Sequence, residues 1–296
     1  MASLKDVKIK IGGVAKTKQI TKAMYMVASA KLRGAQARIE RFRPYAGKFY
    51  DMLRDLAGKA DDSGHPLLVA REEVKTVGIV LATSDRGLCG SFNINLISTA
   101  LKLAAAKRKE GKAVKFYCIG KKGRDAVSKA GYEVAQQIVG QMNNIEFHMA
   151  NTVGLTIIDG YLSGNLDEVF LIYGEFVSMA RQIPVTLPLL PIVPAKAPED
   201  EKAAETAGAA SEYTYEPGEA ALLAELLPRF VKVQVYRGLL DTSASEHAAR
   251  MAAMDNATRN CDELVADLTL LYNKTRQASI TTELIDIVGG VEALNG

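Results

Sequence analysis

Residues 4–33 read LKDVKIKIGGVAKTKQITKAMYMVASAKLR, and this stretch decides the fold. Counting alternately by three and four residues from Leu4 reaches an apolar side chain at nearly every step. The positions are Leu4, Val7, Ile11, Val14, Lys18, Thr21, Tyr25, Ala28, Leu32, Ala35, Ile39, Phe42, Ala46, Phe49, Leu53 and Leu56. Only Lys18 and Thr21 interrupt this heptad seam. Because a repeat of about 3.5 residues winds one helix around another, the pattern predicts a long helix that needs a partner helix along its whole length.

The helix expected from this seam is much longer than a compact domain is wide. At about 1.5 Å per residue it would extend roughly 80 Å. Pro44 should kink it, because a proline inside a helix removes a backbone donor and clashes with the preceding turn. Gly58 and the polar residues 59–64 should end it.

A second long helix is predicted near the C-terminus, where residues 239–288 contain neither glycine nor proline. Gly289-Gly290 follows this stretch, and Pro228 is expected near the start of the helix or at a kink. A weaker seam again steps by three and four, through Met254, Ala257, Cys261, Leu264, Leu268, Leu271, Thr275 and Ala278. The two terminal helices are therefore candidates to pair with each other.

The distribution of charge favours this pairing. Residues 1–57 hold 13 Lys and Arg against four Asp and Glu, a net charge of +9. Residues 217–296 hold seven basic against 11 acidic residues, a net charge of −4. Opposite charges favour association of two helices, although exposed ion pairs are individually weak. The alternative is two solvated helix faces whose charge bias is unrelated.

The segment between the two helices has a different pattern. The apolar run 74–82 predicts a buried strand, and further strands are expected at 113–119, near Val134, at 168–177 and at 184–192. Helices are expected at 93–110, 123–130 and 145–163. Alternation of strands and helices predicts an α/β domain with a largely parallel sheet. Residues 194–218 read as a polar linker.

One loop in this domain is a candidate binding site. Residues 84–93, SDRGLCGSFN, follow a strand and precede a helix, where α/β folds place phosphate sites. The loop lacks both the GxGxxG spacing and the Lys-Ser/Thr ending of a P-loop. A structural turn is therefore favoured, with glycine supplying positive φ and Asn93 capping the next helix.

Composition excludes several classes of protein. Charged residues make up 24% and hydrophobic residues 48% of the chain, and the net charge is +3, too small to indicate a nucleic-acid partner. No apolar run is long enough for a membrane span, and the N-terminus has no signal-peptide pattern. Three separated cysteines indicate reduced thiols and a cytosolic chain. The three histidines are isolated and no catalytic or metal-ligand spacing occurs, so no cofactor and no enzyme activity are expected.

Two helical stretches are candidate contact surfaces. Residues 20–30, ITKAMYMVASA, are apolar on nearly all sides, so this part of the helix must be enclosed by its partner or by other chains. Ordinary core packing is the alternative. Near the C-terminus, Arg276, Gln277, Thr281 and Glu283 lie within two turns of the predicted helix. This polar patch indicates a docking contact or a solvated helix end.

Four motifs together resemble the gamma-subunit family of F-type ATP synthases. They are residues 20–33, ITKAMYMVASAKLR; residues 84–90, SDRGLCG; residues 244–258, ASEHAARMAAMDNAT; and residues 272–283, YNKTRQASITTE. The likeness extends over nearly the whole chain, and the absence of a transit peptide and of the chloroplast regulatory insertion favours a bacterial origin. The resemblance implies a long antiparallel coiled coil of the N- and C-terminal helices plus a central Rossmann-like α/β domain. The expected divisions are 1–58, 70–195, 196–216 and 217–296.

The resemblance also implies a function, a set of partners and contact residues. A gamma subunit is the non-catalytic rotor shaft that transmits torque between the membrane c ring and the catalytic alpha–beta hexamer. By position, Met24, Arg276, Gln277, Thr281 and Glu283 should contact beta. The segment that contains Tyr213, Tyr215 and Glu216 should face epsilon and the c-subunit ring. The chain would then be a peripheral protein on the cytoplasmic face of the bacterial inner membrane.

Two other classes of protein remain as alternatives. A basic coiled-coil nucleic-acid-binding protein would explain the charge of residues 1–57, but the apolar seam runs through the basic stretch instead of following it. An α/β nucleotide-binding enzyme would explain the loop at 84–93.

Overall fold

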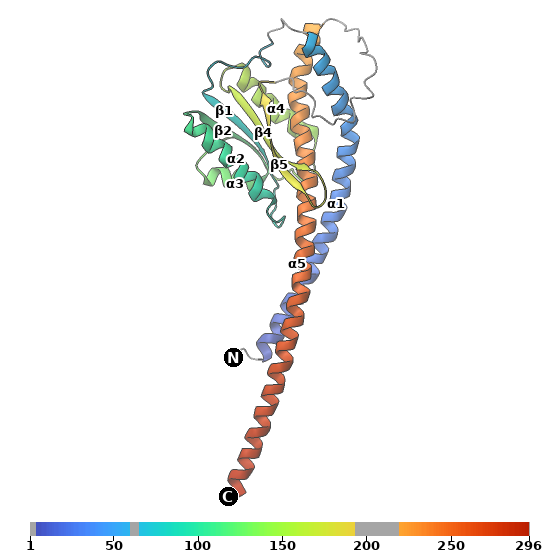
Figure 1. Cartoon of the computed structure of the whole chain (residues 1–296), viewed down its shortest axis with the longest axis vertical. Helices are drawn as coiled ribbons and strands as arrows, with labels where there is room; N and C mark the ends of the chain where they lie inside the picture. The colour runs from blue at the N-terminus through green and yellow to red at the C-terminus, as the bar shows by residue number, and fades with distance from the viewer. Residues whose placement is uncertain (1–3, 60–64, 193–218, 296) are drawn as a thin grey trace. The chain divides into compact units, whose positions relative to one another are not determined.

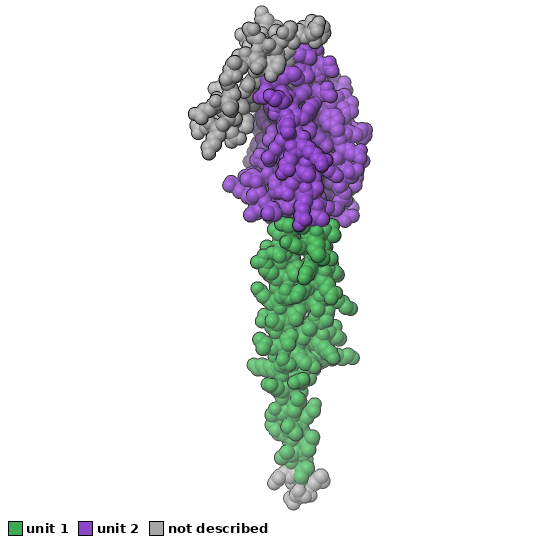
Figure 2. Space-filling model, turned by 90° about the vertical axis from the view of Figure 1, so that its right-hand side faces the viewer, with its two compact units in different colours: residues 1–29, 250–296 green, residues 30–249 purple. Residues whose placement is uncertain are grey.

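The computed structural model describes residues 4–59, 65–192 and 219–295. In chain order the elements are α1 (Leu4–Lys59), β1 (Thr76–Ala82), α2 (Phe92–Lys109), β2 (Ala113–Ile119), α3 (Lys121–Lys129), β3 (Glu133–Ile138), α4 (Phe147–Leu162), β4 (Glu168–Phe176), β5 (Gln182–Leu190) and α5 (Glu219–Asn295). They form two compact units, residues 1–29 with 250–296 and residues 30–249 (Figure 2). Helices α1 and α5 each contribute to both units.

The larger unit, residues 30–249, contains a five-stranded sheet in the order β3-β2-β1-β4-β5 (Figure 1). Four strands are parallel, and β5 runs antiparallel to β4. Strand β1 lies at the centre and is buried along nearly its whole length, as its uninterrupted apolar run predicts. The expected α/β domain with a largely parallel sheet is therefore confirmed.

The face of the sheet that α2 and α3 cover holds a hydrophobic core (Figure 1). Alternate residues of β1 point into it, because successive side chains of a strand face opposite sides. Small side chains on α2 allow the helix to approach the sheet closely. The buried cluster comprises Val77, Ile79, Leu81, Cys89, Phe92, Leu96, Ala100, Ala104, Phe116, Cys118, Val127 and Ile172.

The opposite face of the sheet packs against the part of α5 that belongs to the larger unit. A Cβ atom on Gly238 would lie 3.0 Å from Leu171 Cδ2, so the helix backbone sits directly on strand β4. Helix α4 approaches α5 in a similar way, since a Cβ atom on Gly154 would lie 2.7 Å from Lys232 Cγ. These close approaches favour glycine, because a side chain at either position would force its neighbour to shift.

An aromatic cluster joins three helices within the larger unit. The ring of Tyr236 on α5 lies 5.1 Å from that of Phe42 on α1 and 5.5 Å from that of Phe147 on α4, both edge to face. Further along, Phe230 stacks on Phe49 at 6.4 Å. Such geometries add to the burial of the rings, so they stiffen the junction of α1, α4 and α5.

The smaller unit consists of the N-terminal part of α1 and the C-terminal part of α5, which pair antiparallel. The Thr21 and Thr258 hydroxyls lie 2.8 Å apart, and Lys18 forms an ion pair with Asp262. All the seam positions predicted on α1 up to Phe49 are buried or half-buried, including both polar ones. The seam of the first helix is therefore confirmed up to Phe49, and its two polar residues have polar partners. Leu53 and Leu56 lie outside the side chains that the structure describes.

The seam predicted on the second helix is wrong at alternate positions. Leu264 and Leu271 are both 47% exposed, and Ala278 is exposed as well. The half-buried residues are instead Val265 and Tyr272, one position further along the helix. Both choices step by three or four residues from Cys261, and the sequence pattern does not distinguish them. The position of α1 distinguishes the two choices, because α1 contacts only one side of α5.

Three local details differ from the sequence-based expectations or refine them. Pro44 and Pro228 both lie inside helices, and α1 continues to Lys59. Helix α5 continues through Gly289-Gly290 to Asn295, so these glycines do not end it. Asn93 does not cap α2, because the helix begins one residue earlier and its N-cap is Ser91.

Candidate functional site

The loop after β1 is held by a carboxylate of the chain itself. Asp85 Oδ1 accepts backbone N–H groups from Lys121 and Gly140, both at 2.9 Å, and Oδ2 accepts that of Met142 at 3.0 Å. Nearby, the Thr83 hydroxyl oxygen accepts the N–H of Gly123 at 2.8 Å. These amides lie at the carboxyl edge of the sheet, where related folds bind phosphate. Here the Asp85 carboxylate itself accepts three of these N–H groups.

The rest of the loop is fastened by Asn93 instead of by a ligand. The Asn93 carboxamide accepts the backbone N–H of Ser84 at 3.1 Å and lies 2.7 Å from the Ser84 hydroxyl. The turn uses positive φ at Leu88 (62°) and Gly90 (58°). This geometry supports the structural-turn interpretation of residues 84–93, with glycine supplying positive φ as expected.

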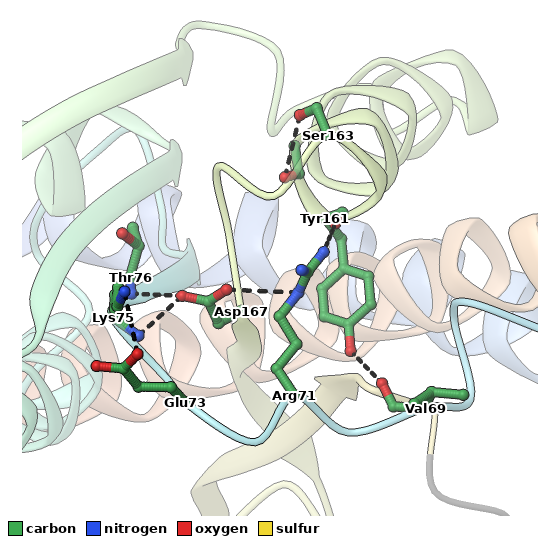
Figure 3. Close-up of polar contacts among 9 residues, drawn as sticks. Val69, Arg71, Glu73, Lys75, Thr76, Tyr161, Ser163 and Asp167 are labelled. Atoms are coloured by element: carbon green, nitrogen blue, oxygen red, sulfur yellow. Dashed lines mark hydrogen bonds and ion pairs between the residues drawn. The ribbon is translucent and has the colours of Figure 1, made fainter.

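A second polar network ties residues 65–75 to α4 and β4 (Figure 3). The Asp167 carboxylate accepts the backbone N–H groups of Lys75 and Thr76, each at 2.8 Å, and lies 3.4 Å from Arg71 Nε. The Arg71 guanidinium also donates to the Tyr161 carbonyl at 2.5 Å and stacks over the Tyr161 ring at 5.3 Å. Every group in the network has a partner within it, so its role is to hold the segment in place.

A pocket of about 470 Å³ opens in the larger unit between α1, α5 and the end of β4. Its charged and polar lining consists of Arg43, Tyr50, Glu175, Arg237 and Asp241. Burial raises the pKa of Asp241 to about 6, although Arg237 opposes the shift. The Arg237–Asp241 separation of 3.9 Å explains why desolvation outweighs the ion pair.

The residues predicted to contact beta on α5 are all exposed in the smaller unit. Arg276, Gln277, Thr281 and Glu283 lie on successive turns with their side chains accessible. The Thr281 hydroxyl donates to the Gln277 carbonyl of its own helix at 3.0 Å. These side chains are therefore available to another chain, and the helix pair itself does not use them.

Met24 lies on α1 at a different level of the helix pair. The Thr21–Thr258 contact places it opposite residues near 255 of α5. About 21 residues of helix separate that level from Arg276, which corresponds to about 30 Å. Met24 is half-buried, whereas its neighbours Met26 and Val27 are 57% and 56% exposed. The structure therefore does not bring Met24 together with the polar residues of α5.

The end of α5 exposes apolar side chains, and no other helix among the described residues covers them. From Ile280 to Val291 every residue is exposed. The large apolar side chains among them are Ile280, Leu284, Ile285, Ile287, Val288 and Val291. Clusters of this kind on a soluble surface indicate a binding surface for another chain.

Tyr213, Tyr215 and Glu216 were predicted to face epsilon and the c ring, and they fall outside the described residues. Within residues 4–59, 65–192 and 219–295, no cluster of three metal-ligating side chains occurs. The same part of the chain contains no helix long and apolar enough to cross a membrane.

Fold and surfaces together define the class of protein. It combines an α/β unit, in which the Asp85 carboxylate binds backbone amides after two other strands, with an antiparallel helix pair that exposes polar and apolar side chains. The family model described as ATP synthase matches residues 3–294. The chain therefore belongs to the ATP synthase family, among its gamma chains.

Curated relatives share this assignment over their full length. The ATP synthase gamma chain of Nitratidesulfovibrio vulgaris strain Miyazaki F is 71% identical over 297 residues, covering 100% of both chains. That of Maridesulfovibrio salexigens is 65% identical over 296 residues, again covering 100% of both. These identities confirm the resemblance on which the sequence-based prediction depends.

Solved structures share the fold. A chain of the Tetrahymena thermophila mitochondrial ATP synthase central stalk and c ring is 26% identical, with a TM-score of 0.59, covering 80% of this chain and 99% of that one. A chain of the Euglena gracilis mitochondrial ATP synthase has a TM-score of 0.68 at 21% identity, covering 98% and 94%. At that identity the second likeness supports the fold alone.

Sequence reasoning missed several residues that organise these surfaces. Asp85 was noticed only as part of a loop, because a carboxylate that binds distant amides has no local pattern. Asp167 lies one residue before β4 and carries no signal beyond its charge. The residues opposite Lys18 and Thr21 could have been sought, since a polar residue in an apolar seam needs a polar partner.

Proposed function

We propose that this chain is the central rotor shaft of a bacterial F-type ATP synthase. It transmits torque between the ion-driven c ring and the catalytic alpha–beta hexamer, and it performs no chemistry itself. The observation that carries the proposal is the exposed end of α5, residues 280–291, where six large apolar side chains lack any cover from the chain's own helices. A helix with such a surface is stable in water only when another protein surrounds it.

The partner contacts extend this proposal. Arg276, Gln277, Thr281 and Glu283 contact the loop of beta that catches the shaft, and Met24 contacts beta at a lower level. The segment of Tyr213, Tyr215 and Glu216 faces epsilon and the c ring. The complex places the chain at the cytoplasmic face of the inner membrane, to which it binds only through its partners.

The division of the chain follows from these roles. Residues 1–58 and 217–296 form the shaft, residues 70–195 form the α/β base, and residues 196–216 link the base to the second helix. A shaft is required because one charge crossing 100 mV supplies only about 2.3 kcal/mol, so several ion transits must be combined for each ATP. A stiff helix pair stores and delivers that work as rotation.

Glu283→Lys tests the proposed contact with beta. Inverted membrane vesicles that carry the variant should pump fewer protons per ATP hydrolysed, because the substitution reverses a charge at the beta contact. Asp267→Lys is the matched control, since Asp267 is equally exposed on the same helix and lies outside the proposed contact. Its ratio of pumping to hydrolysis should equal that of the wild type.

An unchanged ratio in Glu283→Lys vesicles would refute the contact. The shaft role has a separate test, because the chain should co-purify with alpha and beta and release them only on denaturation. The nucleic-acid-binding alternative predicts salt-dependent binding of duplex DNA by the purified chain. The nucleotide-enzyme alternative predicts saturable nucleotide binding by the purified chain.

A further inference from the structure

Two polar residues interrupt the apolar seam of α1, and each meets a polar residue of α5 within the smaller unit. The hydroxyl oxygens of Thr21 and Thr258 lie 2.8 Å apart. One turn away, the ammonium group of Lys18 pairs with the carboxylate of Asp262. Thr21 is only 8% exposed, so its hydroxyl must find its hydrogen-bond partners within the protein.

The two threonine hydroxyls form a coupled pair. Thr21 Oγ1 also lies 3.0 Å from the Lys18 carbonyl, and Thr258 Oγ1 lies 2.7 Å from the Met254 carbonyl. Each hydroxyl carries a single proton. One threonine therefore donates to a carbonyl of its own helix while the other donates across the helix pair. Only the second of these bonds depends on the axial alignment of the helices.

Within the smaller unit, the apolar part of the seam does not by itself select one alignment; the aromatic contacts between α1 and α5 belong to the larger unit. Counting in opposite directions from the Thr21–Thr258 contact places Val14 level with Val265 and Ile11 level with Leu268. Because both seams repeat with the heptad, sliding one helix by a heptad in either direction again sets seam residues against seam residues. Apolar contacts tolerate such a slide, since they have no direction.

The threonine pair does not tolerate a slide of one heptad. After a slide of one heptad, Thr21 would be level with Val265 in one direction and with Met251 in the other. Thr258 would likewise face an alanine or a valine of α1. Both hydroxyls would then lose the bond across the helix pair, and an unmet polar group in a seam is costly. The threonine pair therefore disfavours both slides.

The ion pair distinguishes the two directions. A slide in one direction would place Lys18 beside Asp255, another carboxylate, so the charge would again have a partner. The opposite slide would place it level with Leu268, and Thr269 would then take the position that Asp262 holds, with Asp267 on the other side of that level. Lys18 and Asp262 thus oppose one slide, and the threonines oppose both.

We propose that Thr21 and Thr258, supported by Lys18 and Asp262, are positioning residues that set the axial register of the helix pair. The inference concerns the chain's own helices, so it stands or falls separately from the torque function. Register matters to any partner that contacts both helices, because a slide of one heptad moves one surface past the other by about 10 Å.

The native thiol of Cys261 provides a reporter of register in the full-length chain. Cys261 would be level with residue 11 after one slide and with residue 25 after the other. The variants Ile11→Cys and Tyr25→Cys should therefore form a disulfide with Cys261 only in a slipped register. In the native register the partners are about 10 Å apart along the axis, beyond the reach of a disulfide.

The expected result is a change in disulfide yield. With Thr21 and Thr258 present, neither reporter should cross-link appreciably under mild oxidation. In a Thr21→Val, Thr258→Val background, at least one slipped disulfide should increase about tenfold or more, because valine is apolar in every register. The control is Thr17→Val with Thr269→Val, two exposed hydroxyls that bond only to their own helices. It should produce no increase.

A serine pair makes the test independent of helix stability. Thr21→Ser with Thr258→Ser keeps both hydroxyls, so the slipped disulfides should stay at the level seen with threonine. Circular dichroism measures the helix content of each background. Equal yields of slipped disulfide in the valine and serine backgrounds would overturn the inference, whatever the helix content.

Discussion

Asp241 should make the stability of the larger unit depend on pH. Its side chain is 10% exposed and lies in the pocket between α1, α5 and β4. Arg43, Arg237, Glu175 and Tyr50 line the same pocket. Desolvation raises the pKa of Asp241 to about 6 despite the attraction of Arg237 and Arg43, and Glu175 adds to the rise. The folded protein therefore holds this proton more tightly than the unfolded chain does.

The size and sign of the effect follow from the shift. A rise from the usual value of 3.8 to about 6 corresponds to about 3 kcal/mol, at about 1.4 kcal/mol per pH unit. Below about pH 4 both states keep the proton, and the carboxyl contributes nothing. Between about pH 4 and 6 the unfolded chain releases it first, so the free energy of unfolding falls as pH rises. Above about pH 6 the full cost is present.

Replacing Asp241 with asparagine removes this cost. Urea unfolding of wild type and Asp241→Asn from pH 4 to 8 should give curves whose difference grows by about 2–3 kcal/mol in favour of the variant. Taking the difference cancels the groups that the two proteins share. Arg237→Leu should behave in the opposite way and lose stability as Asp241 ionises. A difference between wild type and Asp241→Asn that stays flat or shrinks with pH would refute the reasoning.

Two further substitutions test the packing. Gly174→Ala should lower the free energy of unfolding by about 1–3 kcal/mol, because the new Cβ would lie 2.6 Å from the Phe92 ring. Thermal unfolding measures this loss. Gly47→Ala is the control and should be neutral or stabilising, because nothing lies within 4 Å of the new Cβ. Val265→Asp should destabilise the helix pair by roughly 1–3 kcal/mol, whereas Leu264→Asp should cost less than about 0.5 kcal/mol in urea titrations. Equal losses at both positions would mean that Val265 is not more buried than Leu264.

Much of the fold could be predicted because its signals are local. The strand 113–119 was predicted with the bounds that the structure gives, and the seam of α1 was predicted position by position. A buried parallel strand needs a continuous apolar run, and a paired helix needs an apolar residue every three or four positions. Both requirements are visible in a short window of sequence.

The second seam shows where such reasoning ends. Leu264 and Val265 are both apolar and adjacent, and either continues the heptad from Cys261. Which of them is half-buried depends on the direction from which α1 approaches. The partner-contact residues are a different case, because Arg276, Gln277, Thr281 and Glu283 came from the family resemblance and remain predictions.

The amino-acid order thus specified the periodic features of this chain: two long seams, a run of buried strands, and the opposite charges of its ends. Only the folded structure decides which residues of α5 are half-buried. It also brings the Asp85 carboxylate to the amides near residues 121 and 140 and raises the pKa of Asp241. Periodicity is a property of neighbouring residues. A register, a hydrogen bond or a desolvated charge depends on groups that lie far apart in the chain, and their distances exist only once the chain has packed.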